Sequence, residues 1–341
     1  MEKILSIIIP TYNMEEYLRK CLNSLIVSDE NMKRLEVLVI NDGSKDSSSQ
    51  IGHEFESKYP QTFRIIDKDN GNYGSCINRG LKEATGTYVQ VLDADDNFNT
   101  DEFNKYLNQI SLLDVDLILS DYVEEDLNGN VLKERNFGLY YNRQIDFEEI
   151  ASLKEFSELQ MHAVTYRLSL LKNNSYSQSE GISYTDQEWM FRPMYYVHSV
   201  FVCDCVVYRY LIGREGQTMS PDIMIKCISH TKQGLLKMVD AYSNMAFETD
   251  GVKSYFRKRL QRRLDYVYLN YIVKYPKSLN AKDLLDFDME IKNRSLEIYN
   301  MADNLSLFYG RLKYVSIWRS NSNSFLLSII KTIYNCYSYF K

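Results

Sequence analysis

The feature of this chain that most restricts its fold is a series of short apolar runs that recur at regular intervals in its N-terminal part. Five such runs cover residues 5–9, 35–40, 63–66, 88–92 and 115–119. Successive runs start about 25 to 30 residues apart, which leaves room for one helix between two strands. Repeated units of this kind predict an α/β fold with a Rossmann-like, mostly parallel, buried sheet and flanking helices.

The segments between the runs have the apolar spacing of amphipathic helices. The pattern predicts helices over residues 13–26, 47–59, 75–84, 101–112 and 186–196. In the first of these, Asn13 is expected to cap the helix, with Glu16 three residues further on. Residues 121–142 are expected to form a hairpin and loop that turns at Gly129.

The alternation of strands and helices stops near residue 220. Beyond it, helical periodicity continues through residues 225–247, 252–273, 281–299 and 304–318. The chain is therefore expected to have two domains, an α/β domain at 1–220 and an all-helical domain at 221–341. The chain has 28 tyrosines, many of them in the second part, and we expect their rings to pack between helices.

Composition excludes several classes of function. The chain carries 40 basic and 46 acidic residues, a net charge of −6, so it lacks the basic footprint of a nucleic-acid-binding protein. Its six cysteines include no CxxC pair, which argues against a zinc site or a disulfide framework. Without a signal peptide or an apolar stretch of about 18 residues, the chain is expected to be cytoplasmic, with peripheral contact at the inner face of the membrane left open.

Polar residues follow three of the predicted strands, where ligands bind in open parallel sheets. Residues 10–13 follow the first strand, 41–44 the second and 93–96 the fourth. Each set taken alone is compatible with helix capping or a plain turn. Three sets at adjacent strand ends instead favour a binding site.

The set at 93–96 contains three carboxylates, those of Asp93, Asp95 and Asp96. Such groups repel one another unless a cation or hydrogen-bond donors compensate their charge. Oxygen ligands with open positions for phosphate oxygens favour Mg²⁺ or Mn²⁺ over zinc. A metal at this strand end would neutralise a leaving diphosphate.

Four motifs in this order resemble the family 2 glycosyltransferases of GT-A fold. They are Ser6-Ile7-Ile8-Ile9-Pro10-Thr11-Tyr12-Asn13, then Val39-Ile40-Asn41-Asp42-Gly43-Ser44, then Asn70-Gly71-Asn72-Tyr73-Gly74 with Asn78-Arg79-Gly80, and Leu92-Asp93-Ala94-Asp95-Asp96. The resemblance covers about residues 3–220 and does not reach the helical region. It implies a GT-A fold and a nucleotide-sugar donor, by default a UDP-sugar.

The resemblance also implies roles for individual residues. It places Pro10, Thr11, Tyr12, Glu15 and Asp42 at the base, with Asp42 accepting a hydrogen bond from a pyrimidine. Asn70, Gly71 and Asn78 would approach the nucleotide and its diphosphate. Asp93-Ala94-Asp95 matches the DxD motif, so Asp93 would face the ribose, and Asp95 would hold the metal with help from Asp93 or Asp96.

An inverting transfer needs a base that takes the proton of the acceptor hydroxyl. The family places an acidic residue at the start of a helix, and the matching segment here is 181–189, which points to Asp186 with Glu188 as the alternative. Two further segments resemble a bacterial branch of the family and place His162, Arg214 and Gln217 on the acceptor side. Thr185 stands where the family usually has its first acidic residue.

The sequence therefore predicts a metal-dependent, inverting hexosyltransferase-type enzyme. Its acceptor is expected to be a saccharide or a lipid-linked saccharide in capsular or exopolysaccharide synthesis. Two alternatives stay open, a nucleotidyltransferase on a related sheet and a non-catalytic binding protein with a degenerate transferase fold. The basic segment 253–263 and the apolar segment 325–334 suggest either membrane contact or homo-oligomer contact through the helical domain.

Overall fold

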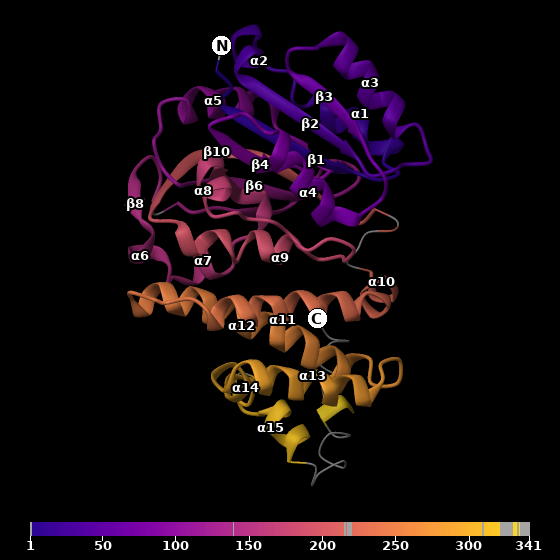
Figure 1. Ribbon diagram of the computed structural model, residues 1–341, viewed down its shortest axis with the longest axis vertical. Coiled ribbons are helices and arrows are strands. Elements are labelled where there is room, and N and C mark those ends of the chain that lie inside the picture. Colours follow the sequence, from indigo (N-terminus) through magenta and orange to yellow (C-terminus); the bar gives the residue numbers. More distant parts are fainter. Residues whose placement is uncertain are drawn as a thin grey trace. The chain divides into compact units, whose positions relative to one another are not determined.

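The computed structural model describes residues 2–138, 140–214, 216, 220–308, 310–320, 330–332 and 334. The chain separates into two compact units, Met1–Gln217 and Thr218–Lys341 (Figure 1). The expected division at residue 220 into two folding domains stays a prediction.

In the described part of unit 1, ten strands form one mixed sheet. They are β1 (Leu5–Thr11), β2 (Leu35–Asn41), β3 (Phe63–Asp67), β4 (Tyr88–Val91), β5 (Asn97–Phe98), β6 (Leu117–Glu125), β7 (Val131–Arg135), β8 (Gln144–Asp146), β9 (Val164–Arg167) and β10 (Ser199–Leu211). Their order is β3-β2-β1-β4-β9-β6-β10-β5, while β7 pairs with β6 and β8 with β10. Strands β1 to β4 are mutually parallel, and β9 runs antiparallel to β4 and β6.

The register of the parallel strands brings their carboxyl ends to one edge. Thr11 at the end of β1 lies opposite Asn41 at the end of β2, which lies opposite Asp67 at the end of β3. Beyond the strands, the backbone N–H of Asp42 donates to the carbonyl of Thr11 at 2.8 Å. The residues that follow these strands therefore lie near one another.

Helices cover the sheet of unit 1 and connect its strands (Figure 1). They are α1 (Glu15–Asn23), α2 (Asp29–Arg34), α3 (Ser48–Lys58), α4 (Asn72–Glu83), α5 (Thr100–Ile110), α6 (Phe147–Ile150), α7 (Lys154–Ser157), α8 (Leu168–Asn173) and α9 (Asp186–Trp189), with short 3₁₀ turns η1 (Met161–Ala163) and η2 (Pro193–Tyr196). Helix α4 packs on β1 and β2, and α3 packs on β3. The predicted hairpin is present as the antiparallel pair of β6 and β7.

Two local predictions in unit 1 were wrong. Asn13 does not cap α1, because its backbone has a positive φ of 53° and its side-chain oxygen accepts from the N–H of Lys45 at 2.8 Å. The single helix predicted over 186–196 ends at Trp189 and is followed by η2, which begins at Pro193. Proline lacks the N–H that a continuing α-helix needs, which explains the break.

Unit 2 is helical in its described residues, as the sequence predicts. Its elements are α10 (Pro221–Lys226), α11 (Ile228–Ser243), α12 (Asp250–Leu269), the π-helical turn η3 (Asn270–Lys274), α13 (Ala281–Arg294), α14 (Leu296–Ala302) and α15 (Tyr314–Arg319). The helix expected at 281–299 is divided at Ser295, whose hydroxyl caps α14 by accepting from the N–H of Ile298. The helix expected at 304–318 is reduced to α15.

Tyrosines do pack inside unit 2. The rings of Tyr255, Tyr268 and Tyr314 are completely buried. Two of the hydroxyls donate to carboxylates, Tyr268 to Asp288 and Tyr314 to Asp265. Most of the apolar segment 325–334 lies outside the described residues, and no helix within the described ranges is long and apolar enough to cross a bilayer.

Candidate active site

The residue expected to recognise the base, Asp42, follows β2 and is buried, with 3% of its surface exposed. Its Oδ1 accepts hydrogen bonds from the Nζ of Lys68 and from the backbone N–H of Gly71 at 2.9 Å. The side-chain amide of Asn70 donates to the Asp42 carbonyl at 3.0 Å. The structure therefore brings three of the predicted nucleotide residues together.

Lys68 is a functional candidate that sequence reasoning missed. Its ammonium donates to Asp42, to the carbonyl of Asp69 at 2.7 Å and to the hydroxyl of Ser75 at 2.9 Å. An ammonium has three N–H groups, so these contacts use all of them. The signal that could have found Lys68 is its place directly after β3, at the same sheet edge as Asp42.

The other residues predicted for the base pocket differ in accessibility. Tyr12 exposes 47% of its surface, whereas Thr11 is buried and donates to the carbonyl of Ile9. Pro10 is half-buried within β1. Glu15 accepts from the N–H of Ser47 at 2.8 Å, which joins the start of α1 to the segment before α3. Of these side chains, that of Tyr12 is the aromatic one, and its ring is accessible.

The three carboxylates after β4 have different partners. Asp93 accepts from the hydroxyl of Tyr73 at 2.8 Å. Asp95 forms an ion pair with Arg214. Asp96, at 2% exposure, accepts from the Tyr208 hydroxyl at 2.6 Å and from the N–H of residue 211 at 2.8 Å. Asp96 is therefore anchored to β10, while Ala94 between the two motif carboxylates is buried.

The electrostatics of the cluster indicate uncompensated negative charge. Burial, together with the charge of Asp95, raises the pKa of Asp93 to about 7, and burial with the same neighbour raises the pKa of Asp96. One ligand atom from each of Asp93, Asp96 and His162 lies within 4.8 Å of the others. Nδ1 of His162 has no hydrogen-bond partner among the described residues. These three residues fit a divalent cation, which would reverse the unfavourable charge balance. The predicted ligand Asp95 is not one of the three, and its carboxylate pairs with Arg214 instead.

Asp186 begins α9 and is partly accessible, and its Oδ2 accepts from the side-chain amide of Gln187 at 2.6 Å. Its charge contributes to the raised pKa of Asp93, which places the two carboxyl groups in the same electrostatic environment. The alternative base, Glu188, is 2% exposed and accepts from the N–H of Ser179 at 3.0 Å. Accessibility to an acceptor therefore favours Asp186 over Glu188 as the candidate base.

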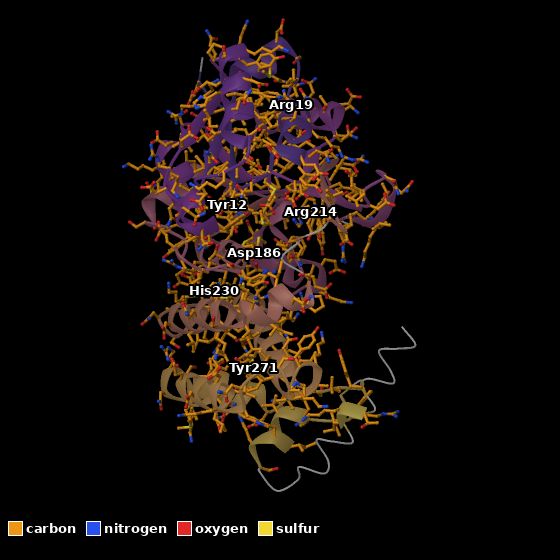
Figure 2. The ribbon with its side chains drawn as sticks, turned by 90° about the vertical axis from the view of Figure 1, so that its right-hand side faces the viewer. Tyr12, Arg19, Asp186, Arg214, His230 and Tyr271 are labelled. Atoms are coloured by element: carbon orange, nitrogen blue, oxygen red, sulfur yellow. The ribbon has the colours of Figure 1, made fainter. Side chains whose placement is uncertain are left out.

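The residues predicted on the acceptor side differ in their burial and in their contacts. His162 exposes 8% of its surface, and its ring stacks on Tyr210 with centroids 4.3 Å apart. Burial lowers the pKa of His162 to about 3, so the imidazole is neutral. Arg214 lies over the ring of Tyr17 as well as beside Asp95. Gln217 lies outside the described residues. Figure 2 labels Tyr12, Asp186 and Arg214 within unit 1.

Asn78 is not directed at the other nucleotide residues. Its side-chain amide donates to the carbonyl of Gln178 at 3.0 Å and to Glu180 at 2.8 Å, and its oxygen accepts from the N–H of Gln178 at 2.8 Å. The side chain thus holds the segment that precedes α9.

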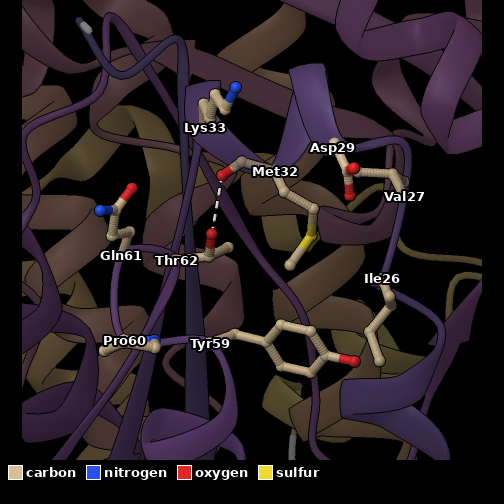
Figure 3. A pocket seen from close by; sticks show the side chains of 9 residues that line it. All are labelled: Ile26, Val27, Asp29, Met32, Lys33, Tyr59, Pro60, Gln61 and Thr62. Atoms are coloured by element: carbon tan, nitrogen blue, oxygen red, sulfur yellow. Dashed lines mark hydrogen bonds between the residues drawn. The ribbon is translucent and has the colours of Figure 1, made fainter.

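None of these groups lines a hollow of about 410 Å³ whose residues are drawn in Figure 3. Lys33 of α2 and Thr62 are among its lining residues. Lys33 lies shortly before the first residue of β2, and Thr62 directly before the first residue of β3. Because the site described above is at the carboxyl ends, this hollow belongs to the opposite edge of the sheet.

The sheet order and the acidic strand ends define a GT-A fold, and the solved structures agree. Staphylococcus aureus TarS 1–349 in complex with UDP-GlcNAc matches with a TM-score of 0.69 at 21% identity, covering 95% of this chain and 92% of that chain. The mannosyltransferase PcManGT from Pyrobaculum calidifontis, in complex with GDP-Man and Mn²⁺, matches with a TM-score of 0.54 at 13% identity, covering 97% and 84%. The predicted fold class is confirmed.

Residues 6–170 match the model of glycosyl transferase family 2, in agreement with the motifs that resemble this family. The uncharacterized glycosyltransferase MG060 homolog of Mycoplasma pneumoniae is 41% identical over 123 residues, 35% of this chain and 41% of the relative. The minor teichoic acid biosynthesis protein GgaB of Bacillus subtilis is 38% identical over 103 residues, 30% of this chain and 11% of the relative. Both alignments span less than two thirds of the relative.

Proposed function

We propose that this chain transfers a sugar from a nucleotide-diphosphate donor to a hydroxyl group of an acceptor, with inversion at the anomeric carbon. The observation that carries the proposal is that the start of α4 contacts both acidic strand ends, because the N–H of Gly71 donates to the buried Asp42 and the hydroxyl of Tyr73 donates to Asp93. The charge of the partly accessible Asp186 also acts on Asp93. The match of residues 6–170 to the family model and the fold shared with a UDP-GlcNAc complex support the same function.

The donor is proposed to be a UDP-sugar. Asp42 accepts a hydrogen bond from the N–H of the pyrimidine, and Tyr12 stacks on its ring. Asp93 faces the ribose and Asp95 holds Mn²⁺ or Mg²⁺, which would supply positive charge to the leaving diphosphate. The PcManGT complex, which contains Mn²⁺, supports a metal at a related fold.

In the proposed step, the acceptor oxygen attacks the anomeric carbon as the bond from that carbon to the diphosphate oxygen breaks. The bonding electron pair leaves with the diphosphate, and the Asp186 carboxylate takes the hydroxyl proton. Attack from the face opposite the leaving group inverts the anomeric centre. Arg214, once separated from Asp95, would balance phosphate charge.

The acceptor is proposed to be a saccharide or a lipid-linked saccharide in the synthesis of a cell-surface polysaccharide. The similarity to GgaB, named for minor teichoic acid biosynthesis, supports this class. His162, Arg214 and Gln217 are proposed on the acceptor side, with the buried His162 acting through the ring of Tyr210 that it supports.

A donor-hydrolysis screen tests the proposed function. The protein is incubated with Mn²⁺ and a panel of UDP-, GDP- and dTDP-sugars, and the released nucleoside diphosphate is measured. We expect release of UDP from one or a few donors, and a chelator should abolish it. Release of inorganic pyrophosphate with sugar phosphates and nucleoside triphosphates would instead indicate a nucleotidyltransferase. Nucleotide binding without turnover, also with candidate acceptors present, would indicate a binding protein.

A further inference from the structure

Residues 177–181, here named the α9-preceding loop, lie along one face of α4. Asn78 makes three hydrogen bonds to this loop and occupies both the N–H and the carbonyl of Gln178. Its third bond reaches the carboxylate of Glu180 at 2.8 Å. One side-chain amide therefore satisfies the backbone of a segment 100 residues away in the chain.

Gly74 allows the loop to approach this closely. A Cβ atom at Gly74 would lie 2.0 Å from the carbonyl oxygen of Ser179, so any larger residue would force the backbones apart. One turn earlier, the carbonyl of Gly71 accepts from the N–H of Gly181 at 3.0 Å. Positions 71, 74 and 78 are three and four residues apart, so they share one side of α4 and its N-terminus.

The other side of the loop is joined to α9. The N–H of Ser179 donates to the buried carboxylate of Glu188 at 3.0 Å, and the hydroxyl of Thr185 donates to the side chain of Gln178 at 3.0 Å. Asp186 is the first residue of α9 and follows Thr185 directly. The loop is therefore held between α4 and the short helix that carries the proposed base.

We infer that Asn78 is a positioning residue that fixes Asp186 through the α9-preceding loop, rather than a ligand of the nucleotide. The inference rests on the proposed role of Asp186. The N-terminal part of α4 also reaches the donor side, because Gly71 donates to Asp42 and Tyr73 donates to Asp93. A single helix thus sets the position of the proposed donor-binding carboxylates and, through Asn78, of the proposed base.

Hydrogen exchange tests the inference without a substrate. In Asn78→Ala, amide exchange at residues 177–186 should rise by at least about tenfold, because the loop opens locally once its anchor is lost. Gly74→Ala should disrupt the same contact between α4 and the loop and should therefore also raise exchange at residues 177–186. It replaces Asn78→Ala if that variant does not fold. Arg79→Ala is the matched control, since Arg79 forms an exposed ion pair with Glu83.

Binding and turnover complete the test. Affinity is measured for whichever of UDP, GDP and dTDP binds the wild type most tightly in the presence of Mn²⁺. Asn78→Ala should change this affinity less than about twofold and lower kcat about tenfold or more, because a misplaced base affects the transition state and not donor binding. Loss of nucleotide affinity with unchanged loop exchange would overturn the inference and restore Asn78 as a nucleotide ligand.

The design separates the inference from the proposed function. If Asp186→Asn retains wild-type turnover, the assignment of the base is wrong. The exchange data would then still show whether Asn78 anchors the loop. If Asp186→Asn is inactive and Asn78→Ala shows fast loop exchange with normal kcat, the loop does not position the base and the inference fails.

Discussion

At the scale of single residues, the ion pair between Asp95 and Arg214 joins two groups with separate proposed roles. Both side chains are largely buried, with 12% and 13% of their surfaces exposed, so the pair is screened less than a surface pair. A cation on Asp95 would compete with Arg214 for the same carboxylate. We therefore expect metal binding and the release of Arg214 toward the diphosphate to be coupled.

The first prediction concerns Asp95. Asp95→Ala should abolish transfer and greatly weaken donor binding in Mn²⁺ or Mg²⁺, because the leaving diphosphate loses its counter-charge. Isothermal titration and turnover measure both effects, with the exposed Asp101→Ala as an acidic control. Full activity in both the variant and the chelator-treated wild type would show that the metal assignment is wrong.

The second prediction concerns Asp186. Asp186→Asn should bind the donor normally and lose at least about 10²-fold in kcat, the lower end of what general bases contribute. Steady-state kinetics and direct binding separate the two quantities. Turnover near the wild-type rate would transfer the role to Glu188 or to another group.

The third prediction uses the raised pKa of Asp93. Its pKa rises from the usual 3.8 to about 7, so the folded state binds this proton more tightly than the unfolded state. The carboxyl group therefore lowers stability progressively from about pH 4 to pH 7 and by a constant amount above. In chelator, Asp93→Asn should raise the Tm by a few degrees at pH 8 and by less at pH 5. An equal gain at both pH values would contradict the assigned pKa.

At the scale of elements, Gly80 shows how tightly α4 fits the sheet. A Cβ at this position would lie 2.5 Å from the side chain of Ile8, which is completely buried in β1. In an exposed helix, glycine to alanine would stabilise by about 1 kcal/mol. At Gly80, overpacking against Ile8 should instead make the substitution to alanine destabilising.

The fourth prediction is that Gly80→Ala lowers the free energy of unfolding by about 1 kcal/mol or more. Urea denaturation measures it, with the exposed helical variant Lys82→Ala expected to stay within about 0.5 kcal/mol of wild type. A more stable Gly80→Ala protein would mean that α4 can shift away from β1 without cost.

Strands β1 to β4 and their polar ends were predictable because a buried parallel sheet needs continuous apolar runs, and these strands coincide closely with the runs. Strands β5, β8, β9 and β10 were not predicted from the sequence. The contacts of Lys68 and Asn78 were not predictable, because each depends on segments distant in sequence meeting in the fold. The predicted helix ends were wrong where a single residue interrupts the helical pattern, as at Pro193. The assignments of individual site residues stay predictions.

At the scale of the whole molecule, membrane contact through the helical region stays a hypothesis. The basic residues of α12 do not form one uniform exposed face, since Lys253 and Arg257 pair with Glu297 and Arg259 is 4% exposed. This reduces the charge available to an anionic surface, where each free basic residue contributes about 1 kcal/mol.

The fifth prediction follows from that hypothesis. The full chain should sediment with anionic vesicles at low salt more than with neutral ones, and deletion of residues 322–341 should reduce the difference. Equal, negligible binding to both kinds of vesicle, or no effect of the deletion, would leave the region with a packing role or a contact between copies of the chain.

Under the proposed role of Asp42 in recognising the base, its bond to Lys68 has a consequence for how nucleotide preference changes in evolution or by engineering. Replacing Asp42 alone with a neutral residue leaves a largely buried ammonium without its counter-charge, and replacing Lys68 alone leaves the carboxylate in the same condition. A double-mutant cycle on unfolding free energy should therefore show that the two single losses exceed the loss in the double variant. The effects of substitutions at Asp42 and Lys68 would then be epistatic. A change of base preference at this site would mainly require that both residues be replaced together.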